Sequence, residues 1–253
     1  MYGSKNISAK GTIDEVDENS YIGQELELFA TAVNWKEYLR RQIQPWLGAQ
    51  VLEVGAGIGA TTRFLFPPSS RRWVCLEPDS AMAQHLQESI NTGKLPGKCE
   101  VMIGSVADVA PPELFDSILY IDVLEHIEDD AAEVRRVAEH LNPGGRLIVL
   151  SPAHQCLYTE FDRSIGHFRR YNARMIKALT PNTLTLERLR YLDVVGTCAS
   201  LANVVFLRQS MPSERQILVW DRLMVPISRW IDPLFAYSLG KSILAVWTRP
   251  ADD

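Results

Sequence analysis

A glycine-rich turn between an apolar run and a helical run carries the sharpest chemical signal in the sequence. Residues 51–60 read VLEVGAGIGA, with glycines at three alternate positions. With Ala60 in the last place, the turn also satisfies the dinucleotide-binding pattern G-x-G-x-x-G/A. The glycines alone therefore do not choose between a dinucleotide and S-adenosylmethionine as the ligand.

Glu53, two residues before the first glycine, separates these two ligands by charge. A dinucleotide brings a doubly negative pyrophosphate to the helix N-terminus, where a carboxylate would repel it. S-adenosylmethionine has no phosphate, and it carries a sulfonium and an ammonium that a carboxylate attracts. We therefore favour S-adenosylmethionine, and a Glu53 turned outward at a strand end is the alternative.

Glu77 ends the next apolar run, 77 − 59 = 18 residues past the third glycine. This spacing is near the roughly 20 residues expected for an acid that binds ribose hydroxyls. Both cofactors contain a ribose, so Glu77 supports a nucleoside site without separating them. The alternative is a carboxylate ahead of Pro78 and Asp79 that caps the following helix.

Three histidines could take the proton that methylation of a hydroxyl or an amine releases, because histidine titrates near neutral pH. His126 opens a helix in LEHIEDD, where local hydrogen bonding is an equal alternative, and His154 directly follows a strand candidate. His167 lies in the irregular, basic segment DRSIGHFRRY. Arg169 or Arg170 would hold a carboxylate or phosphate on the acceptor, unless these arginines only pin the segment to the sheet.

Composition and charge narrow the function classes. The 253 residues carry a net charge of 26 − 31 = −5, so there is no general cationic field for nucleic acid. Four cysteines lie far apart without a C-x-x-C pair, which predicts reduced thiols, a cytoplasmic protein and no metal site. We identify no signal peptide, and no apolar run approaches the roughly 18 residues of a membrane span.

Short apolar runs alternate with helical patterns after Pro45. Strands are predicted at 50–54, 73–77, 100–103, 115–121 and 146–151, and helices at 60–66, 80–92 and 129–141, the last closed by NPGG. This alternation predicts a parallel sheet covered on both faces, with ligands at the carboxyl ends of its strands. One or two helices at 24–44 precede it, and a helix at 173–179, a strand-like run at 184–194 and an apolar run at 242–247 follow.

The expected organisation is a flexible N-terminal arm, 1–20, and a single domain, 21–253. Residues 45–155 would bind the cofactor, and residues 156–253 would face the substrate. A helical insertion, 198–239, has a wide apolar face. It would cap the sheet, unless it forms an acceptor pocket, a dimer seam or a peripheral membrane contact.

Four segments in chain order carry a resemblance to a known family. The runs VLEVGAGIG, CLEPDS, FDSILYIDVLEHIEDD and LNPGGRLIVLSPAH resemble class I S-adenosylmethionine-dependent methyltransferases over residues 48–155. The resemblance implies a Rossmann-like α/β fold, a seven-stranded and mostly parallel sheet with helices on both faces, and an antiparallel last strand, 242–247. A G-H-x-R-R-Y segment occurs in a subset of the family, which favours a substrate-facing role for the run ending at Tyr171.

The resemblance also implies roles for individual residues. The methionine part of the cofactor would contact Glu53, Gly55, Ala56 and Gly57, the ribose would contact Glu77, and Asp122 would lie near the amino group and sulfonium. The family commonly has an acid after the third strand to hold adenine, whereas this chain has Ser105 and Val106. A serine hydroxyl and a backbone N–H can still bind adenine beside Pro78, and Asp108 is a substitute.

The sequence therefore predicts methyl transfer from S-adenosylmethionine to an oxygen or nitrogen of a small acceptor, either hydrophobic or anionic. A secondary metabolite, a sugar or a lipid-linked glycan would suit the apolar insertion, and Tyr21 with the N-terminal arm would close over the acceptor. The alternatives are a non-catalytic, S-adenosylmethionine-binding partner subunit and an NAD(P)-dependent oxidoreductase. A monomer or a homodimer is expected.

Overall fold

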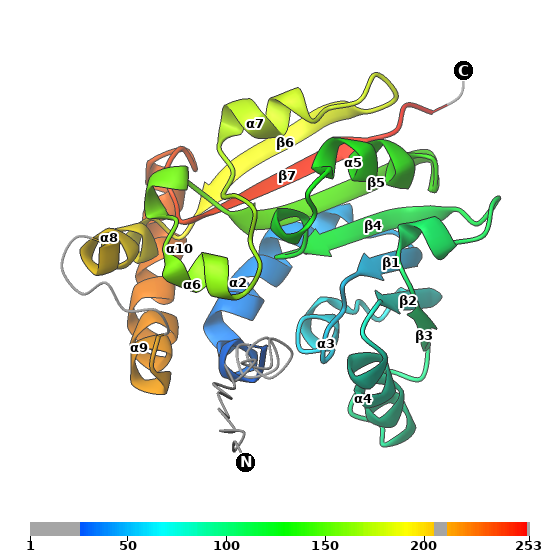
Figure 1. The fold of residues 1–253 in the computed structure, drawn as a ribbon, viewed down its shortest axis with the longest axis horizontal. Helices are drawn as coiled ribbons and strands as arrows, with labels where there is room; N and C mark the ends of the chain where they lie inside the picture. The colour runs from blue at the N-terminus through cyan, green and yellow to red at the C-terminus, as the bar shows by residue number, and fades with distance from the viewer. Residues whose placement is uncertain (1–25, 205–211, 252–253) are drawn as a thin grey trace, which may run out of the picture.

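A single seven-stranded sheet organises the protein in a computed structural model that describes residues 26–204 and 212–251 (Figure 1). The strand order is β3-β2-β1-β4-β5-β7-β6, and β7 runs antiparallel to both of its neighbours while the others are parallel. This confirms the expected fold class. The strands are β1 (Gln50–Val54), β2 (Arg72–Glu77), β3 (Cys99–Ile103), β4 (Phe115–Ile121), β5 (Leu141–Pro152), β6 (Thr185–Leu192) and β7 (Ser242–Thr248).

Helices cover both faces of the sheet (Figure 1). One apolar core packs α5 and α7 on the sheet, and a second core packs α2, α3, α4 and α10 on the opposite face. The helices are α2 (Val33–Ile43), α3 (Thr62–Leu65), α4 (Ser80–Asn91), α5 (Asp130–Ala138), α6 (Glu160–Ser164), α7 (Ala173–Ala178), α8 (Val194–Ala202), α9 (Glu214–Val219) and α10 (Val225–Leu234). A helical turn at 26–30 precedes α2, and a π-helical turn, Trp220–Met224, joins α9 to α10.

The central strands read as continuous apolar runs because both faces are buried. In β1, Val51 belongs to one core and Leu52 to the other, and both are fully buried. The side chains of successive strand residues point to opposite faces. Because β1 pairs in parallel with both β2 and β4, the carboxyl ends of these three strands lie side by side at one edge of the sheet.

Two predicted boundaries near residues 138–146 are wrong. The helix expected at 129–141 ends at Ala138, and β5 begins at Leu141 instead of residue 146. The NPGG run does not stop a helix here, because Leu141 already pairs with Phe115 before the register shifts. A Cβ on Gly145 would lie 2.7 Å from the Asn142 carbonyl oxygen, so this irregular stretch needs glycine.

The helical insertion begins at α8, four residues earlier than predicted. Its start is set by Asp193, a buried residue at φ 68° that caps α8 by accepting from the Gly196 N–H at 3.0 Å. The same carboxylate accepts from Trp220 Nε1 and from Ser228 Oγ, each at 2.6 Å. One side chain thus ties the end of β6 to the later helices of the insertion.

Asp232 ties the insertion to α2 in the same way. Its carboxylate is fully buried, and it accepts from Tyr38 Oη at 2.7 Å and from the backbone N–H groups of Asp193 and Val194 at 2.7 and 3.0 Å. The insertion is therefore part of the folded core. Among residues 26–204 and 212–251, no helix is long and apolar enough to cross a membrane.

Asp232→Ala is expected to lower the free energy of unfolding by about 2–4 kcal/mol, because three donors, two of them buried, lose their acceptor. Urea unfolding followed by circular dichroism measures this. The matched control is Asp129→Ala, which removes an exposed cap on the Ala132 N–H and is expected to cost about 1 kcal/mol. Equal losses in both variants would contradict the anchoring role of Asp232.

Candidate active site

A cavity of about 760 Å³ opens at the carboxyl ends of β1 and β4. This volume lies in the usual range of about 300–1,000 Å³ for small-molecule sites. One wall is the glycine turn after β1, and another is the segment at 157–170. A third, apolar wall comes from the helices: Leu26, Phe29, Trp35, Ile217, Trp220 and Met224.

The glycine turn leaves room for a ligand because its backbone adopts positive φ angles. Gly55 has φ 67°, and a Cβ there would lie 2.6 Å from a methyl group of Val123. The Gly57 N–H donates to Glu77 Oε2 at 2.7 Å, and the Asp79 N–H donates to Glu77 Oε1 at 3.0 Å. Glu77 therefore holds the turn and the start of α4 together, and burial raises its pKa despite these two bonds.

Glu53 points inward and lines the cavity, so an outward-facing position is excluded. Its Oε2 accepts from Thr62 Oγ1 at 2.6 Å and from Trp73 Nε1 at 2.8 Å. Burial raises its pKa to about 7, although both hydrogen bonds favour the ionised form. A cation bound in the cavity would keep this carboxylate ionised.

Asp122 directly follows β4 at φ 55°, and its side chain is exposed to the cavity. Enclosure by the surrounding protein raises its pKa to about 6, while His167, Lys241 and Lys36 oppose the rise. Lys36 donates to the Phe29 carbonyl at 2.5 Å, and burial lowers its pKa to about 8. Carboxylates and ammonium groups thus face one another across the cavity.

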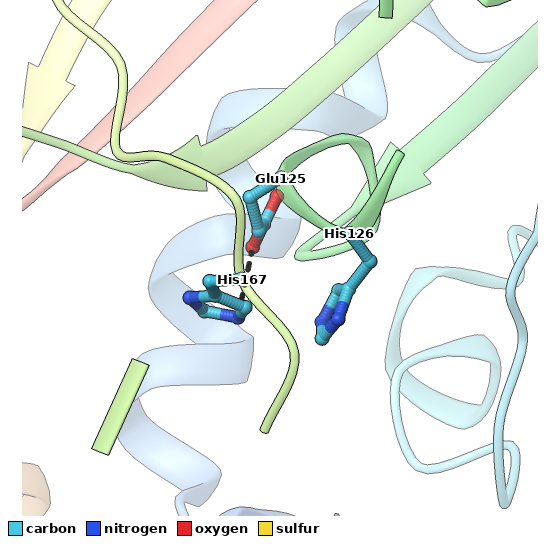
Figure 2. A group of neighbouring side chains, drawn as sticks. All are labelled: Glu125, His126 and His167. Atoms are coloured by element: carbon cyan, nitrogen blue, oxygen red, sulfur yellow. Dashed lines mark ion pairs between the residues drawn. The ribbon is translucent and has the colours of Figure 1, made fainter. Parts of the chain in front are cut away.

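Glu125, His126 and His167 form a cluster on the cavity wall, which we call the Glu-His-His cluster (Figure 2). Glu125 is fully buried, and its Oε1 lies 3.9 Å from His167 Nε2. The two imidazole rings meet edge to face with centroids 4.5 Å apart. Burial and the neighbouring His167 lower the pKa of His126 to about 4, so its ring is neutral near pH 7.

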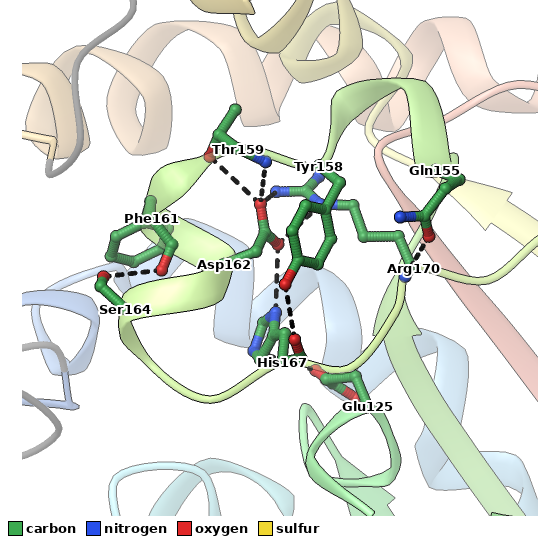
Figure 3. Close-up of polar contacts among 9 residues, drawn as sticks. All are labelled: Glu125, Gln155, Tyr158, Thr159, Phe161, Asp162, Ser164, His167 and Arg170. Carbon is green, nitrogen blue, oxygen red and sulfur yellow. Dashed lines mark hydrogen bonds and ion pairs between the residues drawn. The ribbon is translucent and has the colours of Figure 1, made fainter. Parts of the chain in front are cut away.

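Asp162 organises the segment that carries His167 (Figure 3). This carboxylate is fully buried and forms a two-point ion pair with Arg170, at 2.7 Å to Nε and 2.9 Å to Nη2. It also lies 3.0 Å from His167 Nδ1 and accepts from the Thr159 N–H at 2.8 Å. Burial alone would raise the pKa of Asp162, but the bonds from His167 and Arg170 outweigh it and hold the pKa at about 2.

The structure corrects three of the predicted contacts. His154 does not line the cavity, because its ring stacks on Tyr191 with centroids 4.9 Å apart. Arg169 instead pairs with Asp130 and donates to the Glu128 carbonyl at 2.7 Å. Tyr171 is fully buried in the core, with its hydroxyl 2.7 Å from Asp130 Oδ2. These arginine and tyrosine side chains pin the segment, as the alternative interpretation held.

The predicted adenine contacts follow the ends of β2 and β3, and none of them lines the cavity. Pro78 and Ser105 are exposed, and Val106 is buried in a short 3-10 turn. Asp108 accepts from the Ser105 N–H at 2.8 Å and from its hydroxyl at 2.9 Å, so Asp108 already serves as a local cap. Tyr21 and the arm at 1–20 lie outside the described residues.

Four residues of the site were missed in the sequence. Glu125 stands beside a chosen histidine and Asp162 stands within the segment that was singled out, so neighbouring motifs could have led to both. Lys36 sits in an ordinary amphipathic helix, and Lys241 in a loop before β7. Nothing in their local sequence separates either lysine from a surface residue, because only the folded chain brings them to the cavity.

Comparison with known proteins identifies a domain that part of this chain resembles. The methyltransferase domain family matches residues 52–147. Residues 52–147 of this chain are therefore similar to a methyltransferase domain. The match confirms the resemblance seen in the sequence, while the G-H-x-R-R-Y detail stays a prediction.

Curated relatives match part of the chain, and solved structures resemble most of it. A ubiquinone biosynthesis O-methyltransferase of Xanthomonas axonopodis pv. citri is 29% identical over 116 residues, 45% of this chain and 46% of that protein. The chain thus aligns with about half the length of the curated relatives it matches. A putative methyltransferase of Haloferax volcanii, solved with the Trm112 activator, has a TM-score of 0.60 at 14% identity, covering 92% and 98% of the two chains. Coclaurine N-methyltransferase with bound SAH has a TM-score of 0.54 at 15% identity, covering 95% and 75%.

Asp162→Ala is expected to loosen the segment at 155–170, since its arginine, histidine and backbone donors lose a shared acceptor. We expect faster amide hydrogen exchange in this segment and a loss of about 2–4 kcal/mol in unfolding free energy. Glu160→Ala is the control, because Glu160 pairs with Arg163 at the exposed surface. It is expected to change stability by about 0.5 kcal/mol or less. Unchanged exchange in Asp162→Ala would refute the organising role.

Proposed function

We propose that this chain transfers a methyl group from S-adenosylmethionine to a hydroxyl oxygen of a small acceptor with an apolar body. The observation that carries the proposal is that two groups of residues line the same cavity: the glycine turn with Glu53 forms one wall, and the Glu-His-His cluster forms another. The methyltransferase domain at residues 52–147 and the O-methyltransferase relatives support the reaction class.

The residues of the glycine wall fit S-adenosylmethionine. Gly55 and Gly57 let the backbone approach a ligand without side-chain obstruction, and the carboxylates of Glu53 and Asp122 attract its ammonium and sulfonium. Each oxygen of Glu77 has a further lone pair after accepting one backbone N–H, so Glu77 can still accept from ribose hydroxyls. When bound, the cofactor supplies an electrophilic methyl group on a cationic sulfur. The inward carboxylate of Glu53 argues against the pyrophosphate of NAD(P).

The rest of the cavity suits an acceptor with a flat apolar body. Phe29, Trp35 and Trp220 supply aromatic surface, with the Phe29 and Trp220 rings 6.1 Å apart edge to face. These walls exclude water from the acceptor and limit its orientations. Alignment and desolvation account for most of the acceleration of a methyl transfer, since the leaving sulfur is neutral. The acceptor hydroxyl would face the Glu-His-His cluster. This cluster would favour loss of the hydroxyl proton, which makes the oxygen nucleophilic.

Cofactor binding is expected to weaken as pH falls from 8 to 6. Because the pKa of Glu53 is about 7, its ionised fraction falls by up to about tenfold over this range. Calorimetric titration with S-adenosylmethionine, S-adenosylhomocysteine and NAD at both pH values measures the effect. Glu53→Gln should weaken S-adenosylmethionine binding at pH 8 and flatten most of the pH dependence, leaving a smaller contribution from Asp122.

Glu88→Gln on the exposed face of α4 is the matched control and is expected to bind as the unaltered chain does. Binding of NAD alone would overturn the proposed reaction class. Equal affinities for S-adenosylmethionine in Glu53→Gln and the unaltered chain would remove the charge argument for this residue.

Turnover is expected to depend on His167 and not on His154. With methyl-labelled S-adenosylmethionine and a panel of catechols and aromatic amines, His167→Ala should lose about 10²–10⁴-fold in kcat, the usual contribution of a group that manages the acceptor proton. Its cofactor affinity should change far less than kcat, because His167 lies on the wall formed by the Glu-His-His cluster, held by Asp162, and not in the glycine turn. His154→Ala should retain turnover.

A reversed outcome, with His154→Ala inactive and His167→Ala active, would refute the assignment of the acceptor side. Methylation of the amines alone would replace oxygen by nitrogen as the accepting atom. A further outcome is that the unaltered chain binds the cofactor and transfers no methyl group to any member of the panel. If both variants then bind the cofactor as the unaltered chain does, a non-catalytic partner subunit is favoured.

A further inference from the structure

The Glu-His-His cluster has the composition of a metal centre. One ligand atom from each of Glu125, His126 and His167 can be chosen so that all lie within 4.8 Å of one another. Two imidazoles and one carboxylate are ligands that divalent zinc, manganese, iron or cobalt accepts. All three residues line the cavity, so an ion held by them would have coordination positions open to a small molecule.

The spacing inside the cluster suits an ion better than a direct contact. His167 Nε2 and Glu125 Oε1 are 3.9 Å apart, which is longer than a hydrogen bond between nitrogen and oxygen. A cation with ligand distances of about 2.0–2.2 Å to each atom would span this gap. Figure 2 shows the Glu125 carboxylate directed at His167, with the His126 ring beside them. A small movement of the His126 side chain toward Glu125 and His167 would bring the third ligand to the ion.

The groups behind the two histidines orient the rings for binding. Asp162 Oδ1 lies 3.0 Å from His167 Nδ1, which fixes the ring and leaves Nε2 facing Glu125 (Figure 3). The backbone of Ile165 lies close to the His126 ring. Metal-ligating histidines almost always use their second nitrogen on a carboxylate or a backbone carbonyl in this way.

We propose that Glu125, His126 and His167 bind one divalent transition-metal cation at the cavity wall. The sequence predicts no metal site, because its four cysteines lie far apart and have no histidine at ligand spacing beside them. Glu125 and His126 follow β4, whereas His167 comes from a segment about forty residues later that the Asp162–Arg170 ion pair brings back.

The part that this cation plays in catalysis rests on the proposed function. An acceptor hydroxyl bound to the cation has a lowered pKa, so its O–H bond breaks and the proton leaves to water. The oxygen then forms its bond to the methyl carbon as the carbon–sulfur bond of the donor breaks, and the donor leaves as neutral S-adenosylhomocysteine. No electron is gained or lost, so the cation acts as a Lewis acid only.

Titration of the untagged, metal-free full chain with Co²⁺ tests the site without relying on activity. We expect one Co²⁺ per chain and visible d–d absorption of nitrogen and oxygen ligation, displaced by Zn²⁺. His126→Ala, His167→Ala and the near-isosteric Glu125→Gln should each weaken Co²⁺ binding at least about tenfold. His85→Ala, which removes an exposed histidine on α4, should bind as the unaltered chain does.

Circular dichroism melting and S-adenosylmethionine affinity show whether each variant is folded. Glu125→Gln keeps the shape of a fully buried side chain, and it carries the test if a histidine variant unfolds. No stoichiometric Co²⁺ binding by the folded, unaltered chain would overturn the metal site. Absorption of the cobalt–thiolate type would also overturn it, because the exposed Cys156 or Cys198 would then be the ligand.

The same titrations keep the two proposals apart. A chain that binds Co²⁺ but no S-adenosylmethionine would retain the metal site and lose the proposed function. A chain that binds S-adenosylmethionine and methylates catechols at an unchanged rate after chelation, with no Co²⁺ bound, would keep the proposed function and lose the metal site.

Discussion

The Asp162 carboxylate is the interaction on which the candidate site depends. The sheet alone brings the glycine turn, Asp122 and Glu125 to one edge, but His167 and Arg170 belong to an irregular segment with only short helical turns. A buried carboxylate is stable only when donors surround it, and Asp162 receives them from Arg170, His167 and Thr159 together. That requirement folds the segment at 157–170 back over the strand ends. The second wall of the cavity thus forms because the buried Asp162 carboxylate needs hydrogen-bond donors.

The glycine wall and the apolar wall of helices differ in how they are held. The glycine wall is fixed by backbone geometry and by Glu77, which accepts from N–H groups that follow β1 and β2. The apolar wall is fixed by side chains, because Asp193 and Asp232 attach the insertion to β6 and α2. A backbone-built wall tolerates few changes of shape, whereas a wall of apolar side chains changes shape with each substitution. This division suits an enzyme in which the cofactor is constant and the acceptor varies between relatives.

The sequence predicted the sheet well because its strands are buried on both faces and therefore appear as distinct apolar runs. The bounds of β1 and β4 agree with the prediction, and the antiparallel β7 was expected from the resemblance. The side-chain contacts of the irregular segment could not be predicted in this way. His154 and His167 are both candidates in the sequence, since both follow the fifth strand, and only tertiary packing directs one ring to Tyr191 and the other to the cavity. Arg169 and Arg170 are neighbours with different partners for the same reason. Lys36 and Lys241 give no local signal at all, because long-range packing alone brings them to the site.

The pairing of Leu192 with Ser242 has a consequence for how such a protein can diversify. These residues are the last of β6 and the first of β7, and they lie opposite each other in the sheet. The described residues between them, 193–204 and 212–241, therefore leave the sheet and return to it at the same pair of residues. Changes in the length of this segment need not move any other strand, provided that Asp193 and Asp232 keep their buried partners. The sheet and the glycine turn can thus stay unchanged while the apolar side chains that this segment contributes to the cavity vary.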